Sequence, residues 1–471
     1  MKNSKTIFKM LFLVFIAFQM VSCDDELNQT PITENESSKF YKTESQLEGA
    51  VNATYAVLQF NGLYGLYIPA LGEIPSDNTY VEVPANDNGA FGELDEFTTI
   101  TANVPITRAW KDSYIGIQRA NLVLNRIDGV SYIDQTKKTS RVGEVKFIRA
   151  LIYFNMVRIF GDVPLVTKET INPNDFFGQG RTTKNLVYEQ IIKDLQEAIS
   201  SLPVAQTQAG RVTKGAAQTL LGKVYLTLNE FSKAKEQLEA VVKAGNYTLL
   251  TDVNKIFALD SENNKEIIFA TQFASGINVN TEGTSAFQQF SPSGTVSGAK
   301  GHNLPTKSFF ALYQTNDTRK AAYIGQTTAG VLFTKKLKTA LVVQDSGSDW
   351  VVLRYADVLL MLAEIENELN NPTQAILYLN QVRSRAGLIN SAATGKPAIQ
   401  DAIELERRLE FIGEGHRWFD LLRTNKAITT MNAWFLSQNS KITIDNNDLL
   451  FPIPQSQINT DPAIKQNPGY N

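Results

Sequence analysis

Residues 406–423 read ERRLEFIGEGHRWFDLLR and form the most distinctive run of the chain. It mixes acidic and basic side chains and then carries bulky aromatic residues. On a helix, Glu406, Glu410 and Glu414 fall on one face at i, i+4 spacing, and the arginines at 407 and 408 can pair with nearby carboxylates. Such a set of paired charges occurs in active sites and also in internal ion-pair networks.

Glycine and aromatic residues decide between these two interpretations. Gly413 and Gly415 are expected to break or end the helix. Trp418 and Phe419 indicate that the run is partly buried, and buried charges need partners. We therefore interpret the run as an internal ion-pair and packing motif and not as a catalytic centre.

Composition argues against several classes of function. The 471-residue chain is 43% hydrophobic, which is enough for a large core, and its net charge of −3 leaves no basic surface for nucleic acid. Its only histidines, His302 and His416, lie far apart and outside any HExxH motif, which argues against a zinc site. No Walker loop or G-x-G-x-x-G phosphate cradle is present. We therefore expect no metal, no cofactor and no nucleic-acid partner.

The N-terminus has the layout of a secretory signal peptide over residues 1–22. Lys2, Lys5 and Lys9 supply positive charge, and an apolar run over residues 10–18 follows. This run is well short of the roughly 20 residues that span a bilayer. Nothing later in the chain is long and apolar enough to span one, so the sequence predicts export rather than a membrane-spanning helix.

The single cysteine, Cys23, stands where cleavage would occur. In bacterial lipoprotein signals the residue after the cut is an acylated cysteine, and the small Ser22 before it fits that pattern. An incidental cysteine is the alternative, but the chain has no second cysteine to pair with it. We predict that Cys23 carries lipid, with each buried methylene contributing about 0.8 kcal/mol to anchoring. Residues 23–38 would be a solvated tether, and the acidic residues 24–26 also resemble an export signal to the cell surface.

Helical periodicity dominates the rest of the chain. It predicts helices at 45–58, 109–127, 143–160, 186–202, 214–228, 233–244, 353–369 and 372–386. Residues 266–270 have the pattern of a short strand, and the proline-rich tail from Leu450 onward is not expected to be helical. Two long stretches, 61–106 and 274–305, are irregular, and loops of this length are usually functional or disordered.

Two of the predicted helix pairs share a repeat pattern. The shared positions are Leu221-Gly222, Asn229 and Ala234 in the first pair, and Leu362-Ala363, Asn370 and Ala375 in the second. The interval from the leucine to the last alanine is 13 residues in both. This spacing matches the first half of a tetratricopeptide repeat, in which small residues let two helices approach closely. The earlier helices could form two further pairs with loops inserted between their members.

Motifs along nearly the whole chain resemble those of the SusD/RagB family of outer-membrane nutrient-binding lipoproteins. The matching segments are Leu27 to Pro31, Phe40 to Glu44, the W-x3-Y-x2-I-x2-A-N helix from Trp110 to Asn121, Glu144 with Arg149-Ala150 and Phe160 to Leu165, Arg354 to Leu360, Asn380 to Gly387, Arg407 to Glu410 with Glu414 to Leu421, Phe451 to Pro454, and Gln466 to Tyr470. Each segment alone is a weak signal, but their order behind a lipoprotein signal makes the resemblance specific.

The resemblance implies one mainly α domain over residues 39–471. This SusD-like fold has four tetratricopeptide-like helix pairs in a right-handed superhelix, at about 45–127, 143–202, 214–244 and 353–387, with long loops and a few short strands. It also implies a non-catalytic protein on the outer membrane that faces the cell exterior. Its ligand would be an oligosaccharide or a similar nutrient. Its partner would be a SusC-like TonB-dependent barrel, which it covers like a hinged lid.

Sugar capture needs aromatic faces beside polar groups, because a pyranose has apolar faces and a hydroxyl rim. Three tryptophans, Trp110, Trp350 and Trp418, lie in scaffold-like segments, and Trp434 lies in a less defined one. The resemblance implies that ligand contacts come mainly from the regions 61–106 and 274–305. The candidate ligand-binding residues there are Tyr67, Asp77, Asn78, Tyr80, Phe91, Phe97, Asn103, Phe287, Gln289 and Phe290. The absence of a loop tryptophan argues against a strong starch-like platform.

Two other functions remain open from the residues alone. A helical glycan-degrading enzyme could use two loop carboxylates, because acidic residues are plentiful and their separation in space is not readable from sequence. A tetratricopeptide scaffold that binds only protein would use its helical concave face instead. Turnover on glycans and binding of peptides distinguish these alternatives from sugar capture.

Overall fold

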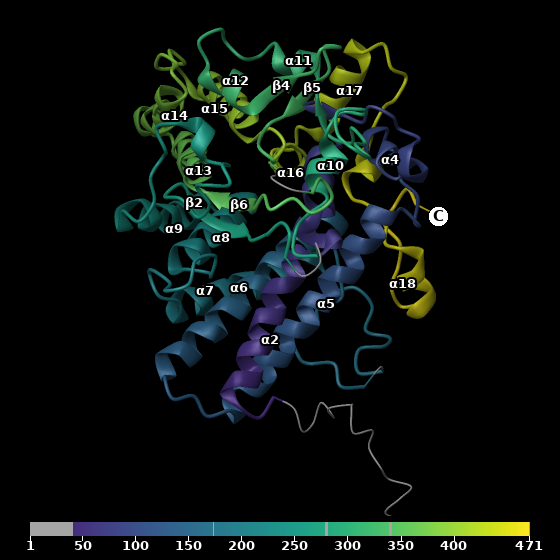
Figure 1. The fold of residues 1–471 in the computed structure, drawn as a ribbon, viewed down its shortest axis with the longest axis vertical. Coiled ribbons are helices and arrows are strands. Elements are labelled where there is room, and N and C mark those ends of the chain that lie inside the picture. Colours follow the sequence, from purple (N-terminus) through teal and green to yellow (C-terminus); the bar gives the residue numbers. More distant parts are fainter. Residues whose placement is uncertain (1–40, 173, 278–280, 339–341, 471) are drawn as a thin grey trace, which may run out of the picture.

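The structure is a computed structural model that describes residues 41–470 except 173, 278–280 and 339–341 (Figure 1). The predicted signal peptide, Cys23 and the tether up to residue 38 lie outside the described residues. Among the described helices, none is both long and apolar enough to cross a membrane.

Helices make up most of the secondary structure. The α-helices of the first half are α2 (Glu44–Ala56), α3 (Tyr67–Glu73), α4 (Gly92–Asp95), α5 (Val104–Arg126), α6 (Gln135–Phe160), α7 (Lys184–Ser201), α8 (Lys214–Thr227) and α9 (Phe231–Ala244). Those of the second half are α10 (Ala286–Phe290), α11 (Lys307–Phe310), α12 (Thr318–Tyr323), α13 (Tyr355–Glu368), α14 (Pro372–Arg385), α15 (Lys396–Phe411), α16 (Arg417–Arg423), α17 (Ala427–Ser437) and α18 (Gln455–Thr460).

Single turns and short strands complete the fold. The 3₁₀ and π turns are η1 (Val57–Gln59), η2 (Asn61–Gly65), η3 (Asn86–Gly89), η4 (Ile127–Gly129), η5 (Val253–Lys255) and η6 (Asn446–Leu449). The strands are β1 (Thr79–Tyr80), β2 (Ile267–Thr271), β3 (Leu304–Pro305), β4 (Ile324–Gln326), β5 (Leu332–Thr334) and β6 (Trp350–Arg354). They form three antiparallel two-stranded sheets, β1 with β3, β2 with β6 and β4 with β5.

Four pairs of neighbouring helices form the frame, namely α2 with α5, α6 with α7, α8 with α9, and α13 with α14. α5 also packs on α6, and α7 on α8, so the first three pairs make one continuous stack. α9 contacts α13, which joins the fourth pair to that stack. In Figure 1, α2, α5 and α6 run through the lower half of the molecule, and α11, α12, α15 and α17 lie at the opposite end. The predicted mainly α fold with four helix pairs is confirmed.

The two repeat-bearing pairs turn in the same way. Asn229 and Asn370 both adopt a left-handed conformation, with φ of 60° and 62°. The N–H of Glu230 donates to the carbonyl of Tyr225 at 2.8 Å. In the other pair, the N–H of Asn371 donates to the carbonyl of Glu366 at 2.7 Å. Asparagine tolerates the left-handed region well, which explains its place at both helix ends. The common interval in the sequence therefore marks a common helix–turn–helix.

Helix starts differ from the predicted ones where a side chain caps the helix earlier. α5 begins at Val104 and not at 109, because the Asn103 side chain accepts the N–H of Ile106 at 3.3 Å. α6 begins at Gln135 and not at 143, because Asp134 accepts the first free N–H groups at 2.8 and 3.2 Å. Capping residues followed by polar turns lack the apolar period that guided the prediction.

The predicted strand at 266–270 is present as β2, and it pairs with β6. The two stretches predicted to be irregular contain several short helices and turns, from η2 to α4 in the first and α10 in the second. The tail prediction was wrong for one segment, because α18 follows directly after Pro454. Helices this short give no periodic pattern over two turns, so sequence reasoning could not find them.

Three of the tryptophans lie in the core, as predicted. Trp110, Trp350 and Trp418 are 2%, 4% and 1% exposed. Trp110 packs edge-on against Phe160 at the end of α6, with ring centroids 5.0 Å apart. None of these three indoles is therefore free to serve as a surface platform for a ligand.

Candidate ligand-binding site

The charged run at residues 406–423 forms a buried ion-pair network. Arg354, at the end of β6, donates to Glu414 at 2.8 Å and to Glu410 at 2.7 Å. Arg319 from α12 contacts Glu406 at 2.6 Å and Glu410 at 2.9 Å. All five side chains are at most 5% exposed. The predicted interpretation of the run as an internal ion-pair motif is confirmed.

Charge balance keeps the network ionised. Burial alone would raise the pKa of the Glu410 carboxyl, but Arg385, Arg354 and Arg319 hold it well below its ordinary value. Removing one partner from such a set leaves an uncompensated buried charge, at a cost of about 3–5 kcal/mol. The helix that carries Glu410 ends at Phe411, and Gly413 and Gly415 follow with φ of 73° and 79°.

The turn through Gly413 and Gly415, which we call the glycine turn, connects the network to the first predicted ligand region, 61–106. The Glu73 carboxylate at the end of α3 accepts the N–H groups of Gly413, Gly415 and His416 at 3.2, 3.0 and 3.2 Å. A Cβ on the neighbouring Gly72 would lie only 2.2 Å from the carbonyl oxygen of Gly415. The region 61–106 is therefore held in place by the motif at 406–423.

The two predicted ligand regions lie side by side. Tyr80 of β1 pairs with Leu304 of β3, so a two-stranded sheet joins region 61–106 to region 274–305. The backbone N–H of Glu82 donates to the carbonyl of Gly301 at 2.9 Å, and its carboxylate accepts the N–H of Ser293 at 2.7 Å. Both regions therefore contribute to one surface, which we call the loop face.

His302 fixes the rim of the loop face. Its ring stacks on Phe91 with centroids 3.9 Å apart and planes 10° apart, and it is fully buried. Its Nε2 lies 2.6 Å from Asp87, which Lys300 also contacts at 3.0 Å. Asp87 has a φ of 51°, a strained value for a residue other than glycine. Only the rarity of histidine in the sequence could have pointed to His302.

Several predicted ligand residues are engaged within the scaffold. Asp77 pairs with Arg408 at 2.7 Å and with Arg417 at 2.8 Å. Asn78 accepts from Arg408 at 3.0 Å and is 1% exposed. Asn103 caps α5 and donates to the carbonyl of Ala90 at 2.8 Å. These polar side chains are buried and stabilise the loop region through contacts with the scaffold.

The aromatic candidates divide between core and surface. Phe91 and Phe290 are 3% and 2% exposed. Phe97 packs edge-on against Trp418 and Phe435, with ring centroids 5.4 and 6.0 Å away. The candidates that remain partly exposed are Tyr67, Tyr80, Phe97, Phe287 and Gln289.

Three of the partly exposed candidates, Tyr67, Tyr80 and Gln289, carry polar side-chain groups. Within the part of the chain that the structure describes, the hydroxyls of Tyr67 and Tyr80 and the side-chain amide of Gln289 make no hydrogen bond. Burial, followed by the nearby carboxylates Glu82 and Asp95, raises the pKa of Tyr80, so its hydroxyl keeps its proton. The loop face thus offers apolar ring surface beside donors and acceptors that can reach a polar ligand.

Comparison with known proteins agrees with this architecture. A sequence profile described as "SusD family" matches residues 322–470, and one described as "Starch-binding associating with outer membrane" matches residues 37–226. The second profile covers the helix pairs α2–α5 and α6–α7 together with most of α8, and the first covers Arg354 and the charged run at 406–423.

The chain is a member of the SusD/RagB family. It is 27% identical to SusD-like protein P25 of Formosa agariphila, over 97% of this chain and 98% of that protein. A solved laminarin-binding SusD-like protein matches with a TM-score of 0.80 and 28% identity, over 91% of this chain and 100% of that one. A SusD superfamily protein from Parabacteroides distasonis matches with a TM-score of 0.79 and 26% identity, over 91% and 99% of the two chains.

This SusD/RagB protein has two surface hollows that the sequence did not predict. One, of about 410 Å³, lies between the α7–α8 loop and β2 and is lined by Gln206, Asn246 and other amide side chains. The other, of about 440 Å³, lies on α5 and is lined by Tyr114 and Phe176 among others. Both fall within the roughly 300–1,000 Å³ of small-molecule sites. Their lining residues lie outside the two predicted ligand regions.

Proposed function

We propose that this protein is a non-catalytic binding protein of the cell surface. It captures an oligosaccharide or a similar glycan-derived nutrient and passes it to a SusC-like TonB-dependent transporter in the outer membrane. The observation that carries the proposal is the similarity to the laminarin-binding SusD-like protein, at 28% identity over 91% of the chain. The profile described as starch-binding and associated with the outer membrane supports the same role.

Ligand capture is assigned to the loop face. Tyr67, Tyr80 and Phe287 supply rings on which the C–H face of a sugar can pack. Gln289, Glu82 and the hydroxyls of Tyr67 and Tyr80 supply partners for the hydroxyl rim. Because no tryptophan lies on the loop face, we expect a small saccharide or a decorated glycan to bind rather than a long starch helix.

Attachment is assigned to the N-terminal lipid. Cys23 would carry the acyl chains at the outer membrane. The acidic residues after it would belong to a flexible tether on the exterior side. The folded body would also dock on the transporter, so the lipid need not be its only attachment. With a flexible tether and this second contact, the folded body could swing away from the transporter while the lipid keeps it attached to the membrane.

Calorimetric titration with a panel of β-glucan, α-glucan and xylan oligosaccharides tests the binding role. We expect at least one glycan to bind, no glycan to be hydrolysed, and a TonB-dependent barrel to co-purify from native membranes. Hydrolysis without any barrel partner would favour the glycan-degrading enzyme. Binding of peptides alone would favour the protein scaffold.

A further inference from the structure

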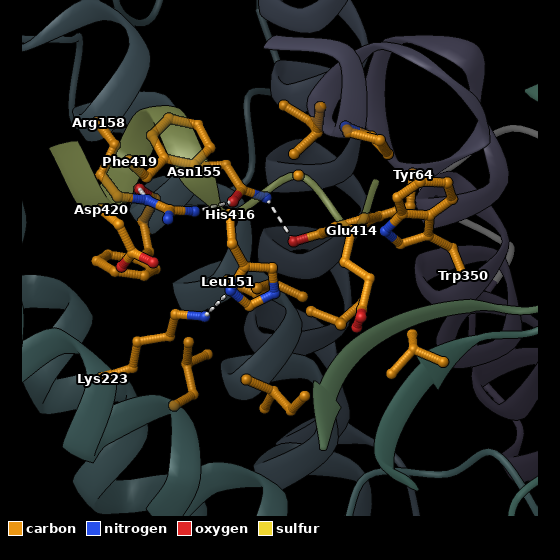
Figure 2. A pocket seen from close by; sticks show the side chains of 18 of the residues that line it. Tyr64, Leu151, Asn155, Arg158, Lys223, Trp350, Glu414, His416, Phe419 and Asp420 are labelled. Atoms are coloured by element: carbon orange, nitrogen blue, oxygen red, sulfur yellow. Dashed lines mark hydrogen bonds between the residues drawn. The ribbon is translucent and has the colours of Figure 1, made fainter. Parts of the chain in front are cut away.

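A small, partly open cavity of about 50 Å³ lies where α6, α8, β6 and α16 meet (Figure 2). A space of this size holds only a few water-sized groups. Its walls are not apolar: Arg158, Lys223 and His416 line it beside Leu151 and Trp350. An oligosaccharide cannot enter it, so it is separate from the ligand site proposed above.

Arg158 is the unusual member of this wall. Its guanidinium lies between the rings of Phe154 and Phe419, 4.0 Å from each centroid. It donates to the carbonyl of Phe154 at 3.0 Å and to the side-chain oxygen of Asn155 at 2.6 Å. No carboxylate among the described residues pairs with it. Burial lowers the pKa of Arg158 to about 10, so it remains charged at neutral pH.

Tyr64 and His416 add hydrogen-bond donors that have no acceptor among the described residues. The Tyr64 hydroxyl accepts from the Asn155 amide at 2.9 Å, so its own hydrogen is directed elsewhere. The Lys223 ammonium donates to Asp357 at 2.9 Å and lies 3.4 Å from Nδ1 of His416. Because an ammonium only donates, Nδ1 accepts and Nε2 carries the proton. Burial, followed by the Lys223 charge, lowers the pKa of His416 to about 3 and keeps the ring neutral.

The acidic side chains on the wall are already engaged. Asp420 accepts from Arg407 at 3.0 Å and from Arg423 at 2.9 Å. Glu414 accepts from Arg354 at 2.8 Å and from Lys336 at 2.5 Å. The cavity therefore presents more donors than acceptors. A water molecule has two hydrogens of its own to place, whereas an anion only accepts and would also be a direct ion-pair partner for Arg158.

We propose that this cavity binds one small monovalent inorganic anion, chloride in the native protein, held by Arg158, Tyr64 and His416. The volume admits a monatomic ion with a water but not a bulky polyatomic ion with its own shell. The ion would join α6 of the first half to the glycine turn and α16 of the second half. It would thus complete the buried charge network rather than take part in glycan capture.

Bromide tests the site directly, because it replaces chloride and scatters anomalously. In crystals grown with sodium bromide in place of sodium chloride, we expect an anomalous peak in the cavity within hydrogen-bond reach of Arg158 and Tyr64. An empty cavity, or one filled by water without an anomalous peak, would overturn the proposal. The experiment uses the unmodified protein, so it does not depend on any variant folding.

Thermal unfolding tests the same site in solution. When chloride replaces gluconate at constant ionic strength, we expect Tm of the wild type to rise by about 1–2 °C for each tenfold increase above Kd. Arg158→Met should lose this dependence. Arg119→Met is the matched control, because Arg119 also donates to a backbone carbonyl, at 2.7 Å from Ala53, and lies over an aromatic ring, 5.1 Å from Phe60, but outside the cavity.

A milder variant keeps the test decisive if Arg158→Met does not fold. Tyr64→Phe removes a single donor and retains the ring, so we expect weaker chloride dependence and lower bromide occupancy. Equal chloride dependence in the wild type, Tyr64→Phe and Arg119→Met would overturn the assignment of the donors. A wild type whose Tm does not respond to chloride would overturn the site itself.

Discussion

The carboxylate of Glu73 accepts a hydrogen bond from the backbone N–H of Gly415 at 3.0 Å. This bond joins α3, which belongs to the first ligand region, to the glycine turn of the buried charge motif. The carbonyl of the same glycine lies so close to Gly72 that an added Cβ would come within 2.2 Å of it. The motif that identifies the family therefore also positions the loop face.

Gly72→Ala should destabilise the protein, because the new methyl group overlaps the Gly415 carbonyl. We expect a loss of about 1–3 kcal/mol in the free energy of unfolding, measured by urea denaturation. Gly49→Ala in α2 is the control, since nothing lies within 4 Å of its added Cβ. That change should stabilise the helix by about 0.5–1 kcal/mol. Equal effects of the two changes would contradict the close contact.

Arg354→Met should cost far more than the loss of a surface ion pair. It leaves the carboxylates of Glu410 and Glu414 without their shared partner in the interior, which we expect to cost about 3–5 kcal/mol. Lys255→Met, whose pair with Asp260 is 51% and 70% exposed, should change stability by less than about 1 kcal/mol. Urea unfolding of both variants checks this. A small effect of Arg354→Met would mean that the network is not tightly coupled to the fold.

Stability should fall below pH 6.5 in a way that depends on His416. Its pKa is lowered from 6.5 to about 3 by burial and by Lys223. Between these two pH values the unfolded chain binds a proton at this residue and the folded protein does not. The stabilising term is full above pH 6.5 and is lost as pH falls, by about 2 kcal/mol at pH 5. His416→Gln should show a smaller drop between pH 7 and pH 5 in urea unfolding. An unchanged drop would show that other groups cause it.

Cys23→Ala should remove the lipid and leave the fold intact. The residue lies before the described domain, so we expect an unchanged Tm together with release of most of the protein from the membrane fraction. Fractionation and a thermal melt on the same preparations check both halves of the prediction. A variant that no longer folds would contradict the role of Cys23 as an anchor.

The helix pairs could be predicted from sequence because their signals are local. The turns at Asn229 and Asn370 repeat the same spacing, and periodic apolar residues mark the helices around them. The site was harder to predict because its contacts are long-range. The predicted ligand residue Asn78 accepts from Arg408, which is 330 residues away. Such a partner cannot be read from one sequence, and the assignment of Tyr67 and Tyr80 to ligand binding stays a prediction.

Calorimetric titration of the wild type and Tyr80→Ala with the tightest glycan of the panel tests whether the loop face captures the ligand. Tyr247→Ala serves as the control, because Tyr247 lines the hollow beside β2, outside the loop face. We expect saturable binding to the wild type and to Tyr247→Ala, and about tenfold or more weaker binding to Tyr80→Ala, a difference of roughly 1.4 kcal/mol. Absence of glycan binding in the wild type, or equal affinity of wild type and Tyr80→Ala with loss in Tyr247→Ala, would contradict this expectation.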